Sequence, residues 1–431
     1  MSMAFLISLG AFLLLGAIGM PIAIAAFAGS IAYMFMSGQD VGLVAEQALN
    51  GLFNSYVLLA VPLFILAANF MNAGTISDRL LTFCIAIVGR FRGGLAHVNV
   101  LASVIFSGMS GSAIADAAGI GRVIIELMTR DNRYPGGYAA ALTAASSVIG
   151  PIIPPSIPMI LYALISGTSI GYLFLAGIVP GLFMALVLMV LNVIVARKRD
   201  FKHDEVVPLR KIPRLTMRAF PALMLPVILL YGIYGGVTTP TEAAAIAAIY
   251  ALVLAGLFYR SVSWKDFYAL VLDGAKSTSV VGLIIASALV LNYLVASENI
   301  PALVADSLSA TQMSPLMFLL MINLIILVLG CLFDATTLLL IVVPLFLPTA
   351  SMLGIDLVHF GVVITINIMI GLITPPYGIL LFVLNGVTGI PLRDIIREIW
   401  PFVFALLCAL IVLVLIPDMV LWLPRMFGYV G

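Results

Sequence analysis

Long apolar tracts separated by short polar segments fill the chain from end to end. The first tract, Met3 to Met36, is divided near its middle by Gly19-Met20-Pro21. A membrane-spanning helix needs about 20 apolar residues, so this tract predicts two helices joined by a tight turn. Similar tracts recur as far as a last one from Pro401 to Leu423. The pattern therefore predicts an all-α polytopic membrane protein.

Two of the apolar tracts are interrupted at their centres. Residues 138–165 contain Ile149-Gly150-Pro151-Ile152-Ile153-Pro154-Pro155-Ser156, and residues 357–384 contain Ile370-Gly371-Leu372-Ile373-Thr374-Pro375-Pro376. Proline removes a backbone donor and its ring clashes with the preceding turn, so each tract predicts a broken helix. At membrane depth, freed backbone is tolerated only inside protein or beside a polar cavity. The two motifs are 221 residues apart (371 − 150), which is typical of a transporter whose repeats meet at the binding site.

Two other tracts predict re-entrant hairpins. In the tract at about residues 95–129, basic residues flank both ends and the middle is small and polar around Ser107 to Gly119. A continuous span would place basic flanks on both sides of the membrane, so a hairpin with both feet on one side is favoured. The tract at about residues 317–348 has its weakest helical stretch at Gly330 to Asp334, and its flanks contain no Lys or Arg. It predicts a second hairpin that enters from the opposite side.

The distribution of charge sets the orientation. Residues 197–218 hold eight of the 20 Lys and Arg residues, so the positive-inside rule predicts that residues 199–218 form a cytoplasmic connecting loop. This loop separates a first repeat, residues 1–198, from a second, residues 219–425. Each repeat is expected to hold five crossings and one hairpin, about ten crossings and two hairpins in all. Because five is odd, the two repeats must be inverted relative to each other.

Composition and motifs narrow the class of function. The chain is 63% hydrophobic and 9% charged, with a mean hydropathy of +1.23, which excludes a soluble domain. The net charge of +1 gives no reason to expect nucleic-acid binding. Neither the phosphate-binding Gly-x-x-x-x-Gly-Lys-Ser/Thr motif nor a His-Glu-x-x-His motif is present. We therefore expect no ATP hydrolysis, no enzyme activity and no transition-metal site.

The broken helices and hairpin tips predict cation sites. Backbone carbonyl and hydroxyl oxygens suit a dehydrated Na⁺, whereas the N-terminal ends of half-helices favour an anionic substrate. We expect two pseudo-symmetric Na⁺ sites. The first would use Ser107, Ser110 and Ser112 with backbone of Gly150, Ile153 and Pro155, and the second Gly330, Gly371, Thr374 and Tyr377. Alternatively, the small residues serve only close helix packing.

Polar side chains in the hairpins are candidates for coupling or for the substrate path. Asp116 and Asp334 could neutralise cations or carry protons, because charge at membrane depth is costly and usually functional; each could instead cap a helix. Arg122 could attract a substrate carboxylate, or could pair only with Glu126 four residues later. Ser156, at the end of the first break, is another candidate.

At Ser110 to Asp116, Ile149 to Ser156, Gly330 to Asp334 and Ile370 to Pro376, the chain resembles the large membrane subunit of tripartite ATP-independent periplasmic (TRAP) transporters. The resemblance covers essentially the whole chain. It implies a bacterial inner-membrane, elevator-type transporter with scaffold and transport domains, coupled to Na⁺. It also implies a small four-helix membrane subunit as a separate chain, a periplasmic substrate-binding protein, and a small organic anion with a carboxylate as substrate.

Two points leave alternatives open. The family pattern more often has a small residue and a proline at the positions of Arg122 and Glu126, so the return leg of the first hairpin departs from it. A self-sufficient ion-coupled carboxylate transporter with a similar inverted-repeat fold would share the same pattern.

A membrane enzyme would need a nucleophile with a base, or a metal cluster, at membrane depth, and the sequence shows neither. Two dead-end hairpins disfavour a passive channel.

Overall fold

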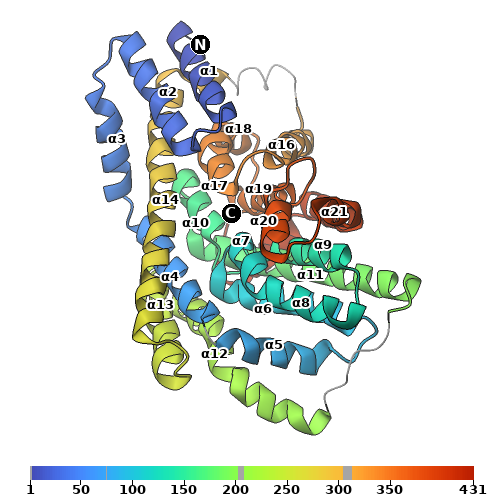
Figure 1. The fold of residues 1–431 in the computed structure, drawn as a ribbon. Helices are drawn as coiled ribbons and strands as arrows, with labels where there is room; N and C mark the ends of the chain where they lie inside the picture. Colours follow the sequence, from blue (N-terminus) through green and yellow to red (C-terminus); the bar gives the residue numbers. More distant parts are fainter. Residues whose placement is uncertain (1, 74, 202–207, 304–312) are drawn as a thin grey trace.

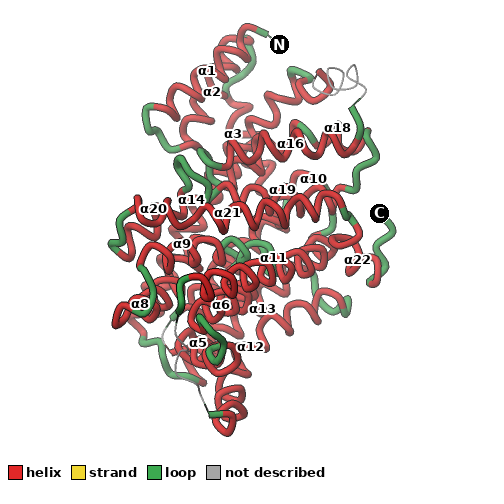
Figure 2. The backbone as a smooth tube through the Cα atoms, turned by 90° about the vertical axis from the view of Figure 1, so that its right-hand side faces the viewer, coloured by secondary structure: helices red, strands yellow, loops and turns green. Residues whose placement is uncertain are grey.

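A computed structural model describes residues 2–73, 75–201, 208–303 and 313–431, and this part of the chain is helical without strands (Figures 1 and 2). The chain begins with α1 (Met3–Ala17) and α2 (Ile22–Ser37), and the tight turn predicted between them is confirmed. Gly19 adopts a left-handed conformation there, which glycine tolerates without steric cost. The next elements are α3 (Gly42–Phe53), a 3₁₀ turn (Tyr56–Leu59), α4 (Ala60–Asn72) and α5 (Thr75–Val88).

The first hairpin and the first broken helix follow each other directly. The hairpin consists of α6 (Gly94–Ser110), a tip at residues 111 and 112, and a return leg of α7 (Ala113–Asp116), a π turn (Ala117–Gly121), α8 (Arg122–Thr129) and a 3₁₀ turn (Arg130–Asn132). The broken helix consists of α9 (Gly136–Ser147) and α10 (Ile157–Ser166), and α11 (Ile170–Lys198) ends this half.

The second half follows the same order. It contains a 3₁₀ turn (Leu209–Lys211), α12 (Ile212–Tyr234), α13 (Pro240–Val253), a π turn (Leu254–Phe258) and α14 (Trp264–Ser297). The second hairpin has α16 (Pro315–Gly330) as one leg, and α17 (Ala335–Thr337), a π turn (Leu338–Val342), a 3₁₀ turn (Val343–Leu345) and α18 (Leu347–Met352) as the other. The second broken helix is α19 (Leu357–Gly371) and α20 (Ile379–Thr388), followed by α21 (Leu392–Leu415) and α22 (Asp418–Met426).

Two expected boundaries are wrong. The last seven residues of the expected loop, 212–218, are already helical and begin α12. Pro213 lies in the first turn, where its missing N–H costs nothing, and the arginines that follow favour a helix. The last span does not run from Pro401 to Leu423, because α21 begins at Leu392, continues through Pro401 and ends before the bend at Pro417.

Length and apolarity alone identify five helices among the described residues that can cross a membrane, or six if α3 and α4, bent by 70°, form one span. The remaining apolar helices are only 10–17 residues long. They include α1, α2, the first leg of each hairpin (α6 and α16) and three of the half-helices (α10, α19 and α20). Such pieces cross only in combination. The expected ten crossings and the inverted relation of the repeats stay predictions.

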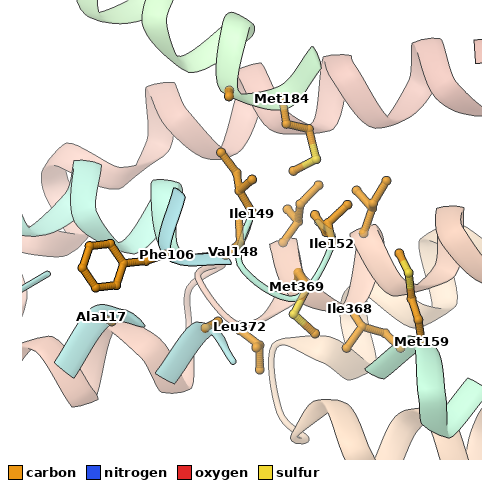
Figure 3. Close-up of a cluster of buried hydrophobic side chains, with 14 of the residues drawn as sticks. Phe106, Ala117, Val148, Ile149, Ile152, Met159, Met184, Ile368, Met369 and Leu372 are labelled. Carbon is orange, nitrogen blue, oxygen red and sulfur yellow. The ribbon is translucent and has the colours of Figure 1, made fainter. Parts of the chain in front are cut away.

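The two breaks share one apolar core. Figure 3 shows Val148, Ile149 and Ile152 of the first break beside Met369 and Leu372 of the second. All five side chains are buried and belong to the same hydrophobic cluster. This packing holds the half-helices on either side of each break, and hence the ends of those half-helices at the break, at fixed positions relative to each other.

Candidate transport site

The tips of both hairpins and the ends of both breaks border one cavity of about 290 Å³. The first hairpin contributes residues 110–115, and the first break contributes Pro151, Ile157 and Pro158. The second hairpin contributes residues 334–336, and the second break contributes Leu372 and Ile379. One wall is formed by α4 and α14. Segments separated by more than 200 residues in sequence therefore meet at the place that the repeated motifs predict.

The first hairpin tip rests on the backbone of the first break. A β-carbon added at Gly111 would lie 2.5 Å from the Pro155 carbonyl oxygen, and Gly111 has a left-handed backbone with φ of 58°. Only glycine permits both the conformation and the close approach. A β-carbon at Gly150 would lie 3.7 Å from an Asp116 carboxylate oxygen. The tip is thereby held against the break.

The second hairpin and the second break meet through two glycines. A β-carbon at Gly371 would lie 2.7 Å from the α-carbon of Gly330, and one at Gly330 would lie 3.2 Å from the α-carbon of Gly371. The Gly378 N–H donates to the Cys331 carbonyl at 3.3 Å. Ser112 begins α7 by accepting from Ala115 N–H, and Asp334 begins α17 by accepting from Thr337 N–H. The two tips are built alike.

Each break leaves carbonyl oxygens free. Among the described residues, none donates a hydrogen bond to the backbone carbonyls of Gly150, Ile153 and Pro155. The same holds for the backbone carbonyls of Gly330, Thr374 and Tyr377, whereas that of Gly371 accepts from Thr374 N–H at 3.0 Å. Gly150, Pro155 and Gly330 are buried, and buried carbonyls without donors are uncommon, since most are paired in native structures. Such oxygens are the kind of ligand that an alkali cation needs.

Several buried side-chain oxygens near the first break also lack partners. Within the described part of the chain, the hydroxyls of Ser110 and Ser147 and both carboxylate oxygens of Asp116 lack a well-formed hydrogen bond, and Ser103 is the side chain that approaches the Asp116 carboxylate. Each of the three residues is at most 3% exposed. An unpaired buried carboxylate costs several kcal/mol unless it is neutralised. A bound cation or a proton on Asp116 would remove this cost.

The other hydroxyls predicted for the sites have local partners. Ser107 donates to the Val104 carbonyl, Thr374 donates to the Ile370 carbonyl at 2.7 Å, and Ser156 donates to the Pro151 carbonyl. Ser156 also accepts from Met159 N–H at 3.2 Å and so begins α10. The Ile153 side chain points away from the cavity and packs on Gly181 of α11. Ile153 therefore offers only its backbone.

Of the predicted site residues, only Ser110, Ser112 and Asp334 line the cavity. Among the others, Arg122 and Tyr377 are exposed. Arg122 pairs with Glu126 at 2.9 Å, and both side chains are more than half exposed. This is the local pairing that the four-residue spacing allowed, and Arg122 does not line the cavity. Tyr377 is 51% exposed and its ring lies 5.0 Å from that of Phe382.

The wall formed by α4 and α14 could not be predicted from the motifs. Asn69 of α4 lines the cavity and donates to the Leu270 carbonyl of α14 at 3.1 Å, and Ser277 of α14 also faces the cavity. The only signal in the sequence was a single amide side chain within an apolar tract. Among the described residues, no group of His, Cys, Asp and Glu is arranged to hold a metal ion.

Comparisons with known proteins agree on a family. Residues 6–419 match the family model described as "Tripartite ATP-independent periplasmic transporter, DctM component". The chain is 40% identical to the sialic acid TRAP transporter large permease protein SiaM of Vibrio cholerae, over 95% of this chain and 96% of that one. It is 41% identical to the C4-dicarboxylate TRAP transporter large permease protein DctM of Pseudomonas aeruginosa, over 86% and 87%.

A solved structure shares the fold at low sequence identity. The YdaH transporter of Alcanivorax borkumensis superposes with a TM-score of 0.64 over 86% of this chain and 87% of its own, at 14% identity. The chain thus combines a transporter fold with a family match over nearly its full length. It belongs to the DctM components of TRAP transporters, the large permeases, which are multi-pass proteins of the inner membrane.

Proposed function

We propose that this large permease takes up a small carboxylate anion with Na⁺, after delivery by a periplasmic binding protein, through an elevator movement. The observation that supports this best is the cavity bordered by both hairpin tips and both breaks. In the first break, which contributes Pro151 to that cavity, the carbonyls of Gly150, Ile153 and Pro155 accept no hydrogen bond from a described residue. A cation there would satisfy oxygens that otherwise have no donor.

The first Na⁺ site would use Ser107, Ser110 and Ser112 with the three carbonyls of the first break. The second would use Gly330, Gly371, Thr374 and Tyr377. Each site joins a hairpin tip to a broken helix, so Na⁺ binding would hold the tip closed over the cavity. Asp116 lies next to Gly150 and would neutralise the charge of the first cation.

The substrate would lie in the cavity between the N-terminal ends of α10 and α20. Both half-helices begin at its wall, at Ile157 and Ile379, and helix N-termini favour anions. Asp334 also borders the cavity and would repel a carboxylate unless a cation is bound nearby. Anion and Na⁺ would therefore bind together. The names of the two relatives, a sialic acid and a C4-dicarboxylate transporter, fit an acidic substrate.

The moving unit would contain both hairpins and both broken helices. The scaffold would contain α4, α13 and α14: α4 packs against both α13 and α14, and α4 and α14 form the opposite wall of the cavity. A cavity between a moving unit and a scaffold is where an elevator would carry its substrate. The family description, a tripartite transporter, supports a small membrane subunit as a separate chain and a binding protein as partners.

Uptake into proteoliposomes tests the proposal. The permease would be reconstituted with its small subunit, a candidate binding protein would be added outside, and labelled sialic acid or a C4-dicarboxylate would be offered with and without an inward Na⁺ gradient. We expect concentrative uptake only with the gradient and the binding protein. Uptake by this chain alone would favour the self-sufficient carboxylate transporter, and equal flux without any gradient would indicate a channel.

A further inference from the structure

A second cavity, of about 550 Å³, lies at the opposite end of α6 from the transport site and has a different chemistry. It is bordered by the end of α5, the start of α6 and the C-terminal third of α11. Its polar residues are Arg92, His97 and Arg197, and the others are apolar. The combination of a basic end and an apolar wall is the chemistry that recognises an anionic amphiphile.

The cavity has a polar end and an apolar wall along a single helix. Met189, Val190 and Val193 precede Arg197 by eight, seven and four residues, so the four side chains share one face of α11. Val190 lies about 10 Å from Arg197 along the helix axis, at 1.5 Å per residue. Val190 and Val193 are 52% and 38% exposed. A hydrocarbon chain that starts at Arg197 would thus run down this face.

The polar end has unused donor capacity. Arg197 is exposed and forms no ion pair with any described residue. The His97 side chain is only 5% exposed, and its Nε2 has no hydrogen-bond partner within the described ranges. Arg92 donates to the Phe201 carbonyl at 3.2 Å and pairs with Asp200, whose side chain is 88% exposed. A phosphate could replace that solvated carboxylate.

We propose that this cavity binds an anionic phospholipid of the cytoplasmic leaflet, with the phosphate at Arg92, His97 and Arg197 and one acyl chain along Met189, Val190 and Val193. The basic residues in this region place it on the cytoplasmic side by the positive-inside rule. Basic pockets between membrane helices on that side bind anionic head groups. The lipid would fill the space between α5 and α11 and hold the start of the first hairpin.

Fluorescence quenching by brominated lipid tests the proposal without any transport assay. Phe91 borders the cavity and is 54% exposed, so Phe91→Trp adds a reporter there to the three native tryptophans. The purified permease would be placed in vesicles that contain dibrominated phosphatidylglycerol or dibrominated phosphatidylcholine at equal mole fraction. The quenching of the added fluorescence then gives the relative affinity of the two lipids.

We expect phosphatidylglycerol to bind at least about fivefold more tightly, the effect of one basic residue near an anionic head group. Arg197→Gln in the reporter protein should lower the ratio about fivefold, because it removes one of the basic residues. Arg214→Gln, which removes an equally exposed charge from α12, should leave the ratio unchanged. Equal affinity for both lipids would overturn the proposal, as would an equal loss in both variants. Relief of quenching by soluble glycerol phosphate would also overturn it, because it would show recognition of the anion alone.

Discussion

At the scale of single residues, Gly371 and Gly330 decide how closely the second hairpin approaches the second break. Gly371→Ala would place a methyl group 2.7 Å from backbone atoms of Gly330, and backbone cannot move aside as a side chain can. We expect the hairpin to be displaced and the protein to be destabilised by about 1–3 kcal/mol, the usual cost of overpacking. Thermal unfolding of the purified permease in detergent measures this.

Gly386 of α20 is a matched control, since a β-carbon there meets nothing within 4 Å. Gly386→Ala should leave the midpoint of unfolding unchanged or raise it slightly, because alanine is favoured over glycine in a helix. Equal destabilisation by the two substitutions would show that the close glycine contact does not limit packing.

The hydroxyl ligands give a second prediction at this scale. Ser112→Ala and Thr374→Ala should each raise the Na⁺ concentration for half-maximal uptake, by about tenfold if each hydroxyl contributes as a hydrogen bond to a charged group does. Uptake would be measured in proteoliposomes over a range of external Na⁺. The substrate concentration is kept constant so that only the cation dependence changes.

Two substitutions separate loss of a ligand from loss of a local bond. Ser314→Ala removes the same kind of helix cap as Ser112→Ala, and Thr388→Ala removes the same bond to a carbonyl four residues earlier as Thr374→Ala. Neither residue lies at a hairpin tip or at a helix break. Unchanged Na⁺ dependence in Ser112→Ala and Thr374→Ala, or an equal change in the two controls, would count against the proposed sites.

The sequence singled out Asp116 and Arg122 alike but did not show their surroundings. Asp116 stood out because a carboxylate inside an apolar tract is costly, and in the structure it is buried without a well-formed hydrogen bond. Arg122 stood out for the same reason, yet it pairs with Glu126 on an exposed face. A four-residue spacing shows that two side chains can meet, but not whether that face of the helix points inward.

At the scale of elements, the contact between α10 and α19 fixes one half-helix against the other break. The Tyr162 hydroxyl donates to the Leu357 carbonyl at 2.6 Å, and a β-carbon on Gly361 would lie 2.2 Å from the Tyr162 ring. Gly361→Ala should therefore push α10 away from α19, lower the unfolding midpoint and reduce uptake more than tenfold. This follows if the breaks must keep their relative positions within about 1 Å.

A second-site change tests that explanation. Tyr162→Leu added to Gly361→Ala removes the clashing ring atoms, so uptake should recover in the double variant relative to Gly361→Ala. The comparison is made at equal amounts of permease in the vesicles. No recovery would mean that Gly361 acts through something other than its contact with Tyr162.

Breaks were more predictable than helix ends. Glycine and proline restrict the backbone directly, so the interruptions after Ser147 and after Gly371 followed from the motifs. The predicted start of the last span at Pro401 was wrong, because α21 begins nine residues earlier. A proline can lie within a helix when its neighbours are strongly helical. The start of α12 was missed for a related reason: arginines that mark a cytoplasmic segment also favour helix, so charge alone does not separate loop from helix.

At the scale of the whole molecule, the repeated motifs predicted that the two breaks come together but not what encloses them. The 221-residue offset relates the first break to the second. The wall from α4 and α14 has no such signature, since neither helix contains a repeated Gly-Pro motif. A pseudo-symmetric centre can be inferred from a duplicated motif, whereas the partner surface of a plain apolar helix depends on tertiary packing.

The inverted arrangement requires that positions 198 and 430 lie on opposite sides of the membrane. An ion pair of 2.6 Å joins Arg199, after α11, to Glu398 in α21, so the basic ends of these two helices lie together. In the inverted arrangement, five crossings lie between Lys198 and the C-terminus and one lies between Glu398 and the C-terminus. Both numbers are odd, so Val430, which is 96% exposed, would lie outside. In a permease whose three native cysteines are replaced, an impermeant thiol reagent added to intact cells with a permeable outer membrane should label Val430→Cys. It should label Lys198→Cys only after the inner membrane is opened. Labelling of both from the same side would require an even number of crossings in the second half, and two halves of that kind could not be inverted copies of each other.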